Sequence, residues 1–340
     1  MKLSDHFKQF LGDISLNPSR IDRIDSAYET WRDILEKDNE IKDKFLDFFL
    51  QGSYATQTSI RPQKEGEEFD VDAVLKLDLE DDDMSPKEAL DWLVKRMKAN
   101  ESYKDKIKAR DRCVRINYAG DFHMDIVLAK ASDNNYIYIP SKKEGEWKKT
   151  NPEGFITWCK GIHSDQKEQF RNVTKLLRYW RDHKIGKQTA PKSILLTTLI
   201  GKSMVGKNSV AESLLETVKN MINDLDSYIL DDGAVFVENP SLTEENLARD
   251  WDKDKLETFK KKLNSLKNEA QAAFDENNKS ESIKKWQIIF DKFPTELNEA
   301  SGMAARINSG SVLVSTSGLF SPDEGVPSPK HRFFGDERGW

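Results

Sequence analysis

Cysteine and long apolar runs are both scarce in this chain of 340 residues. The two cysteines, Cys113 and Cys159, lie far apart and in neither a metal-binding nor a redox spacing, so we expect reduced thiols and no structural zinc. The longest apolar runs, such as 194–200, are too short to cross a bilayer. The first residues also lack the apolar core of a signal peptide. We therefore expect a cytoplasmic protein without a membrane segment.

An excess of positive charge is missing too. Lysine and arginine number 53 against 59 aspartates and glutamates, which gives a formal net charge of −6. Proteins that bind long nucleic acids depend on clustered Lys and Arg, so polymeric nucleic acid is the less favoured substrate. With 37% hydrophobic and 33% charged residues, the chain has the composition of a polar globular protein with one large or two moderate cores.

A glycine-centred turn is predicted at residues 51–58, Gln-Gly-Ser-Tyr-Ala-Thr-Gln-Thr. It follows a compact apolar run at 45–50, which we expect to be a strand or a last helical turn. An isolated Gly-Ser pair is usually only a turn, but this one lies between an apolar run and an acidic strand. Glycine lets the backbone approach an oxyanion without a clashing Cβ, and turn amides with a serine hydroxyl bind phosphate well. Gln51, Gly52 and Ser53 are therefore candidate nucleotide-binding residues.

Two acids, Asp70 and Asp72, lie on the strand predicted at 69–77. Side chains at i and i+2 of a strand share one face, about 7 Å apart. An edge strand with solvent-facing acids is the alternative, but the apolar flanks indicate a buried strand, where an unpaired acid is costly. Paired acids of this kind normally share a cation, and a set of oxygen ligands suits Mg²⁺ or Mn²⁺ rather than zinc.

A third acid is expected on the same side. Residues 113–118 and 122–129 predict two strands of a hairpin. In the second strand four apolar residues share one face, whereas Asp125 lies on the other, where it can join Asp70 and Asp72. Three acids beside a phosphate-binding turn predict metal-assisted nucleotidyl transfer.

The second half of the chain has a helical pattern. Apolar residues recur every three or four positions in 170–180, 191–202, 256–273 and 286–293. From residue 301 onward glycine, serine and proline dominate. We expect a core lobe at 1–160 with a long N-terminal helix that begins near Asn17, a helical lobe at 161–305 and a flexible tail at 306–340.

Together these motifs resemble the polymerase-β-like nucleotidyltransferases. Segments 172–180 and 191–193 resemble the helix pair of the oligoadenylate synthases and their bacterial relatives. Length and segment order are most similar to the bacterial CD-NTases, the cyclic-oligonucleotide synthases of antiphage signalling. The resemblance covers roughly residues 15 to 300. It implies an α+β fold of two lobes, with a mixed sheet in one and helices in the other.

The resemblance also implies roles for the candidate residues. The three acids would hold two Mg²⁺ or Mn²⁺ ions, and the donor triphosphate would contact a further set: Gln51, Gly52, Ser53, Lys175 and Ser193. As alternatives, Lys175 is an ordinary solvated lysine and Ser193 caps the helix after Pro191. ATP is the expected substrate, with GTP and other NTPs as further candidates, and the product is a cyclic di- or trinucleotide.

Other activities stay open. An RNA-end, protein or small-molecule nucleotidyltransferase would use the same chemistry, and a catalytically silent nucleotide-binding scaffold would have lost it. Animal relatives that sense double-stranded DNA carry a zinc-bound insertion of His and Cys. Two distant cysteines cannot build that insertion, so direct activation by DNA is not expected.

The tail yields a prediction of its own. Its last ten residues contain three aromatics after a polar linker, which is typical of a segment that docks into a partner's groove; a plain disordered end is the alternative. The resemblance implies an accessory regulatory protein that recognises this tail, although a terminal Trp340 departs from the small residue expected for conjugation. Deleting 309–340 should leave nucleotide synthesis near the wild-type rate and abolish binding to that accessory protein in a pull-down. Loss of synthesis by the truncated enzyme alone would contradict this view.

Overall fold

The computed structural model describes residues 1–62, 66–80, 84–118, 122–132, 136–186 and 188–298, and the backbone of three two-residue strands farther on. These strands form a small sheet in the order β11-β10-β12: β10 (Leu313–Val314), β11 (Phe320–Ser321) and β12 (Val326–Pro327). The rest of the predicted tail lies outside the described residues.

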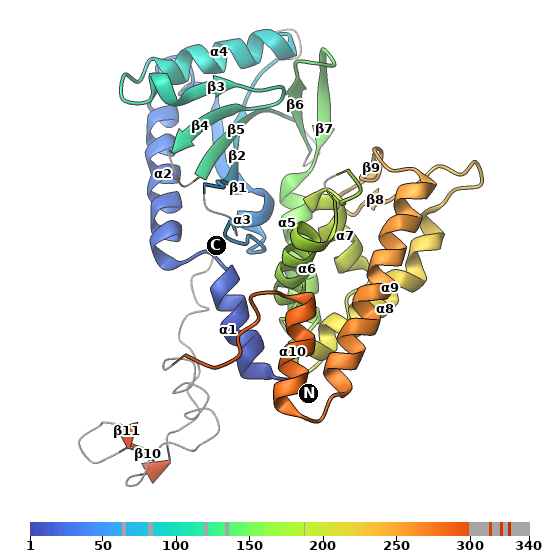
Figure 1. Cartoon of the computed structure of the whole chain (residues 1–340). Coiled ribbons are helices and arrows are strands. Elements are labelled where there is room, and N and C mark those ends of the chain that lie inside the picture. Colours follow the sequence, from blue (N-terminus) through green and yellow to red (C-terminus); the bar gives the residue numbers. More distant parts are fainter. Residues whose placement is uncertain are drawn as a thin grey trace. The chain divides into compact units, whose positions relative to one another are not determined.

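The chain divides into two compact units. One comprises Met1–Asp13 with Glu269–Trp340, and the other comprises Ile14–Asn268 (Figure 1). These units join the two ends of the chain, whereas the lobes expected at 1–160, 161–305 and 306–340 are consecutive segments. Those lobes remain a prediction.

A mixed sheet forms the centre of the larger unit. Its strands follow the order β1-β2-β5-β4-β3, with β6 added to β5 and β7 to β6. Only β2 and β5 run parallel; the other neighbours are antiparallel. The strands are β1 (Phe45–Gln51), β2 (Phe69–Leu77), β3 (Ile107–Ala109), β4 (Val114–Tyr118), β5 (Phe122–Ala131), β6 (Ile137–Ser141) and β7 (Glu146–Thr150).

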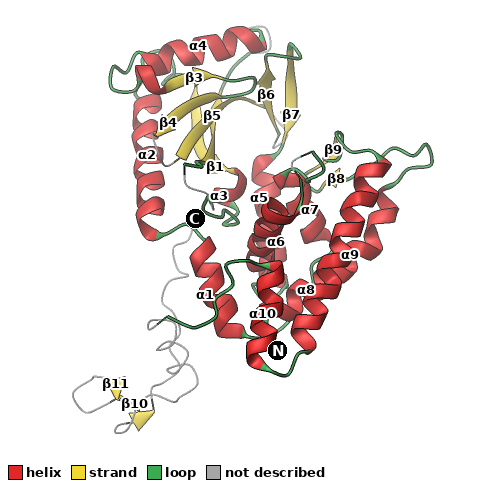
Figure 2. Ribbon diagram, in the orientation of Figure 1, coloured by secondary structure: helices red, strands yellow, loops and turns green. Residues whose placement is uncertain are grey.

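Two helices pack on the sheet through one apolar core (Figure 2). They are α2 (Pro18–Glu36), which contributes Trp31, and α4 (Pro86–Lys98), which contributes Leu90. Both helices begin where the local sequence dictates. The Asn17 side chain accepts a hydrogen bond from a backbone amide in the first turn of α2. Ser85 forms a capping box with Glu88 at the start of α4. Each such cap stabilises its helix by about 1 kcal/mol.

The larger unit continues into a group of helices. They are α5 (Pro152–Asp165), α6 (Phe170–Lys184), α7 (Ser193–Lys202), α8 (Val210–Asp224) and most of α9 (Lys253–Asp275). A short four-residue helix, α3 (Gly52–Ala55), follows β1. Short 3-10 turns occur at Lys104–Lys106 and Leu225–Tyr228. The helical pattern is confirmed, but a two-stranded hairpin of β8 (Glu238–Asn239) and β9 (Leu242–Asn246) interrupts it. Because these short strands are polar and lack alternation, the sequence did not indicate them.

The smaller unit joins segments from distant parts of the chain. It contains most of α1 (Ser4–Ile14) and all of α10 (Lys279–Ile289). The ring of Phe7 meets Trp286 edge to face at 4.8 Å and Phe293 at 4.9 Å. The sequence predicted a long helix from Asn17 but not the separate α1 before it.

No helix in the described ranges is both long and apolar enough to cross a membrane.

Candidate active site

The parallel pairing of β2 with β5 brings the predicted acids together. Asp72 lies directly opposite Asp125 in the register, and Asp70 lies opposite His123. Paired strands are about 4.8 Å apart, so the carboxylates of neighbouring strands are close. The exposed fraction of the side chain is 59% for Asp70 but only 12% for Asp125. The strand β5 is buried on both faces for most of its length, so Asp125 lies in the interior although it is on the polar face that the sequence predicted.

An arginine that the sequence analysis missed lies among these acids. Arg115 on β4 is the register partner of Asp125. Its Nε and Nη2 donate to the two carboxylate oxygens of Asp125, each at 2.7 Å, and Nη2 also donates to Asp70 at 3.0 Å. The predicted hairpin could have indicated it. If Tyr118 pairs with Phe122, then counting back along β4 and forward along β5 places Arg115 opposite Asp125.

Asp72 has a strongly shifted pKa. Burial, reinforced by the negative charges of Asp125 and Asp70, raises the pKa of Asp72 to about 7. Buried like charges oppose ionisation because each carboxylate loses water and gains repulsion. The site therefore has more negative charge than the neighbouring arginine neutralises.

The predicted glycine turn lies against these acids. Gln51 pairs with Asp72 across β1 and β2, and Gly52 follows with a φ of +67°. A Cβ on Gly52 would stand 2.4 Å from Asp72 Oδ2, so only glycine fits there without a shift. Ser53 next shares a hydrogen bond of 2.9 Å with Ser59. The structure thus brings Gln51 and Gly52 to Asp72, and Ser53 follows them in α3.

Lys175 and Ser193 lie on α6 and α7. Lys175 Nζ donates to Ser15 at 3.0 Å, and burial lowers the pKa of this lysine. Ser193 accepts a bond of 3.1 Å from Arg181. It is the first residue of α7 and not its N-cap, which is Lys192, so the capping alternative is wrong. Neither of these two hydrogen bonds reaches the acids.

A second arginine was also missed. Arg178 on α6 is only 8% exposed, and burial lowers its pKa to about 10. Its Nη1 donates to the Thr58 carbonyl at 3.2 Å, while Nε is buried with no hydrogen-bond partner among the described residues. The negative charge of Asp72 acts on it in the opposite direction to burial. Its position three residues after Lys175, on the same side of a helix, is the signal that could have found it.

The acids fit a divalent cation in chemistry and register. Carboxylate oxygens are the ligands of Mg²⁺ and Mn²⁺, and a cation would relieve the repulsion that raises the pKa of Asp72. In the described part of the chain, however, no three His, Cys, Asp or Glu side chains are already arranged to hold a metal ion. Asp125 and Asp70 instead face the guanidinium of Arg115.

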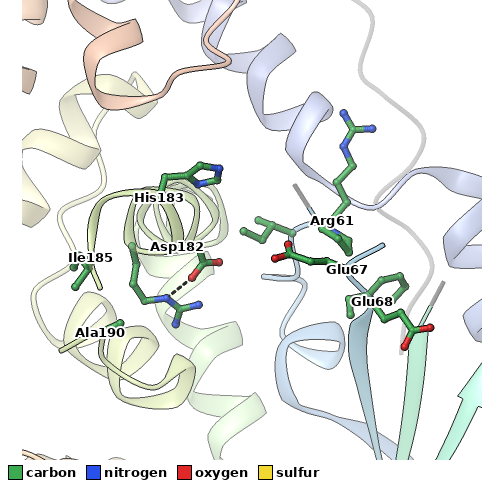
Figure 3. A pocket seen from close by; sticks show the side chains of 11 residues that line it. Arg61, Glu67, Glu68, Asp182, His183, Ile185 and Ala190 are labelled. Atoms are coloured by element: carbon green, nitrogen blue, oxygen red, sulfur yellow. Dashed lines mark hydrogen bonds and ion pairs between the residues drawn. The ribbon is translucent and has the colours of Figure 1, made fainter. Parts of the chain in front are cut away.

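A pocket of about 420 Å³ opens beside the start of β2 (Figure 3). The residues before and at that start form one wall, with Arg61, Glu67 and Glu68 among them; the end of α6 and the loop after it form the other. Glu68 pairs with His123 Nε2 at 2.7 Å. The volume lies within the range of small-molecule sites, and the lining carries charges of both signs.

The close contact at Gly52 gives a stability prediction. Gly52→Ala should destabilise the protein by about 1–2 kcal/mol from the positive φ, with a further loss because Asp72 must move. Gly145→Ala is the matched control, since Gly145 has a φ of +72° and no atom within 4 Å of the added Cβ. Denaturant unfolding of both variants measures the difference. Equal losses would contradict the contact between Gly52 and Asp72.

The raised pKa of Asp72 predicts a pH dependence of stability in metal-free protein. Because the folded pKa is about 7 and the unfolded value about 3.9, the folded state keeps a proton that the unfolded state releases. The contribution of Asp72 to stability is therefore fully present below about pH 4, is lost as the pH rises through 7, and changes little above that. Asp72→Asn removes this loss, so the variant should exceed the wild type at pH 8 by on the order of 2–4 kcal/mol, with a much smaller difference at pH 5.

Unfolding in EDTA at both pH values measures that effect. Asp70→Asn is the comparison: it keeps Asp72, so its stability should still fall with rising pH, but less steeply than in the wild type because one of the charges that raise the pKa of Asp72 is gone. A parallel pH dependence in the Asp72→Asn variant and the wild type would show that Asp72 is not the titrating group.

Comparison with known proteins bears directly on this site. Residues 1–162 match the family model of the Second Messenger Oligonucleotide or Dinucleotide Synthetase domain, SMODS. A c-di-GMP synthase of Roseivirga ehrenbergii is 27% identical over 300 residues, which cover 79% of each chain. A cyclic AMP-AMP-AMP synthase of Acinetobacter sp. is 25% identical over 312 residues, covering 90% of this chain and 89% of the relative.

A solved structure has the same fold. The E. coli MS115-1 CdnC in its complex with HORMA-deltaN superposes with a TM-score of 0.70 at 17% identity, covering 87% of this chain and 98% of that chain. The polymerase-β-like fold with a mixed sheet, which the sequence predicted, is thereby confirmed. The sequence relatives carry the names of cyclic nucleotide synthases. The chain is thus a nucleotidyltransferase similar to the bacterial CD-NTases, and its residues 1–162 match the SMODS domain.

Proposed function

We propose that this protein joins nucleoside triphosphates into a cyclic di- or trinucleotide second messenger. The observation that carries the proposal is the register of Asp72 opposite Asp125, with Asp70 on the same strand and Gly52 against Asp72. The names of the two sequence relatives support a cyclic product, of two nucleotides in one and three in the other.

The three acids would bind two Mg²⁺ or Mn²⁺ ions. When bound, these ions lower the pKa of a ribose hydroxyl and neutralise the triphosphate. Asp125 is the proposed group that accepts or relays the proton of that hydroxyl. The hydroxyl oxygen forms a bond to the α-phosphorus, and the bond from that phosphorus to the leaving pyrophosphate breaks. The same reaction on the bound linear intermediate would close the ring.

The donor triphosphate would lie between the turn and the helices. Gly52 permits close approach of the backbone, and Ser53 offers a hydroxyl. Lys175 and Ser193 are proposed to contact the triphosphate from α6 and α7. Arg178 joins this set, because it is buried near the turn and its Nε is without a partner among the described atoms. A polar group left unpaired in the interior is costly, which favours a ligand that supplies the missing acceptor.

The biological setting is part of the proposal. ATP is the first candidate substrate, followed by GTP and other NTPs, and an acidic net charge favours such small acceptors over polymers. We propose a role in antiphage defence and a cytoplasmic location. An accessory protein that binds the C-terminal tail is proposed as the regulator, and the complex of the neighbour CdnC with HORMA-deltaN is a precedent for a partner protein.

The first test separates a cyclase from an enzyme that extends RNA. Purified protein with ATP, GTP and Mg²⁺ or Mn²⁺ should release pyrophosphate and yield a small phosphatase-resistant product, with no RNA added. Asp70→Asn/Asp72→Asn should make no product while its circular dichroism is unchanged. Turnover only on an added RNA end, a protein or a small molecule would replace the cyclase with that alternative. Absence of turnover with every nucleotide pair would favour the silent scaffold.

The second test concerns Lys175. A lysine that neutralises the donor triphosphate should act through binding, so Lys175→Ala should raise the apparent KM for nucleotide at least tenfold. Lys175→Arg should restore part of the affinity, because a planar fork replaces a compact charge. Lys184→Ala is the control, since Lys184 is exposed on the same helix. Wild-type kinetics for Lys175→Ala would show that Lys175 does not contact the triphosphate.

A further inference from the structure

Arg115 occupies the position between two proposed metal ligands. Its guanidinium donates hydrogen bonds of 2.7 Å to both carboxylate oxygens of Asp125 and one of 3.0 Å to Asp70. The side chains of Arg115 and Asp125 are only 19% and 12% exposed, so water screens this pair poorly. A bidentate guanidinium–carboxylate pair of this kind is among the strongest that side chains form.

A divalent cation would need the same oxygens. A carboxylate has lone pairs enough for both a metal and a hydrogen bond, so hydrogen bonding alone does not exclude a shared site. Charge does. A guanidinium within hydrogen-bond distance of both Asp125 and Asp70 would stand close to an ion that those two acids share, and the two positive charges repel. The acids also fail to converge on a metal position among the described residues while they face Arg115.

We infer that Arg115 is a built-in counter-ion that holds Asp70 and Asp125 in the metal-free protein and must leave them when the metal binds. Arg115 is therefore a positioning residue that competes with the metal. It preserves the acid cluster before substrate arrives, and it weakens the binding of metal alone. This inference rests on the proposed metal site of Asp70, Asp72 and Asp125.

The experiment measures Mn²⁺ binding by the full chain without nucleotide, from the free Mn²⁺ signal in electron paramagnetic resonance. Arg115→Met should bind Mn²⁺ at least tenfold more tightly than the wild type, and Arg115→Lys should lie between them. The melting temperature of Arg115→Met in EDTA should fall, and Mn²⁺ should raise it by more than in the wild type. An arginine with a merely structural role would lower stability without changing the affinity for the metal.

The matched control is Arg112→Met. Arg112 pairs with Glu144 at 2.7 Å, and its loss changes the net charge by the same amount without removing a bond to the acids. Equal Mn²⁺ affinity in Arg115→Met and Arg112→Met, weaker binding by Arg115→Met than by the wild type, or no detectable binding by Arg115→Met would each overturn the inference.

Asp70→Asn/Asp72→Asn separates this inference from the metal site itself. If that variant binds Mn²⁺ as well as the wild type does, the proposed metal site is wrong. If it loses binding but Arg115→Met behaves like Arg112→Met, only the role of Arg115 is wrong.

A wild-type measurement covers the case in which Arg115→Met does not fold. The Nε–H of Arg115 donates to Asp125. In EDTA, its exchange with water, measured by ¹⁵N NMR, should therefore be slow. Saturating Mg²⁺ should speed that exchange at least tenfold. Unchanged exchange at saturating Mg²⁺ would overturn the inference.

Discussion

The parallel pairing of β2 with β5 is the constraint on which the site depends. A slip of one residue would turn Asp125 to the opposite face and separate it from Asp72. The register is held by the apolar residues that alternate with the acids, since Val71 and Met124 are fully buried opposite one another. The same packing that stabilises the sheet therefore fixes the spacing of the carboxylates. Core and site are specified by alternate positions of the same two strands.

The site accumulates charge that the fold alone does not favour. Asp72 is buried against like charges, and Arg178 is buried with an unpaired Nε in the described structure. Each would be less costly in water. Because these charged groups are not all paired with a group of opposite charge, the electrostatic field within the site is strong. A site that binds an anionic triphosphate together with cations requires such fields, because the ligands complete the pairing that the protein leaves unfinished.

Features set by local sequence were predictable. Asn17 and the alternation around Asp70 and Asp72 act within a few residues, and the structure places α2 and β2 where those signals predict them. Arg115 was missed although its partner Asp125 was predicted, because its role appears only when the hairpin register is counted through. Arg178 depends on contact with Thr58, 120 positions earlier in the chain. That contact leaves no pattern in the local sequence, and only the spacing of Arg178 from Lys175 on α6 could have indicated it.

The smaller unit has a consequence for biosynthesis. Phe7 and Phe10 of α1 bury their rings against Trp286, Phe290 and Phe293. At a synthesis rate of about 5–20 residues per second, the two phenylalanines are made on the order of ten seconds or more before these three aromatic partners. During that interval the apolar face of α1 lacks these partners while the sheet strands are already being made. A nascent chain therefore leaves Phe7 and Phe10 without these aromatic partners until residues 286–293 have been made.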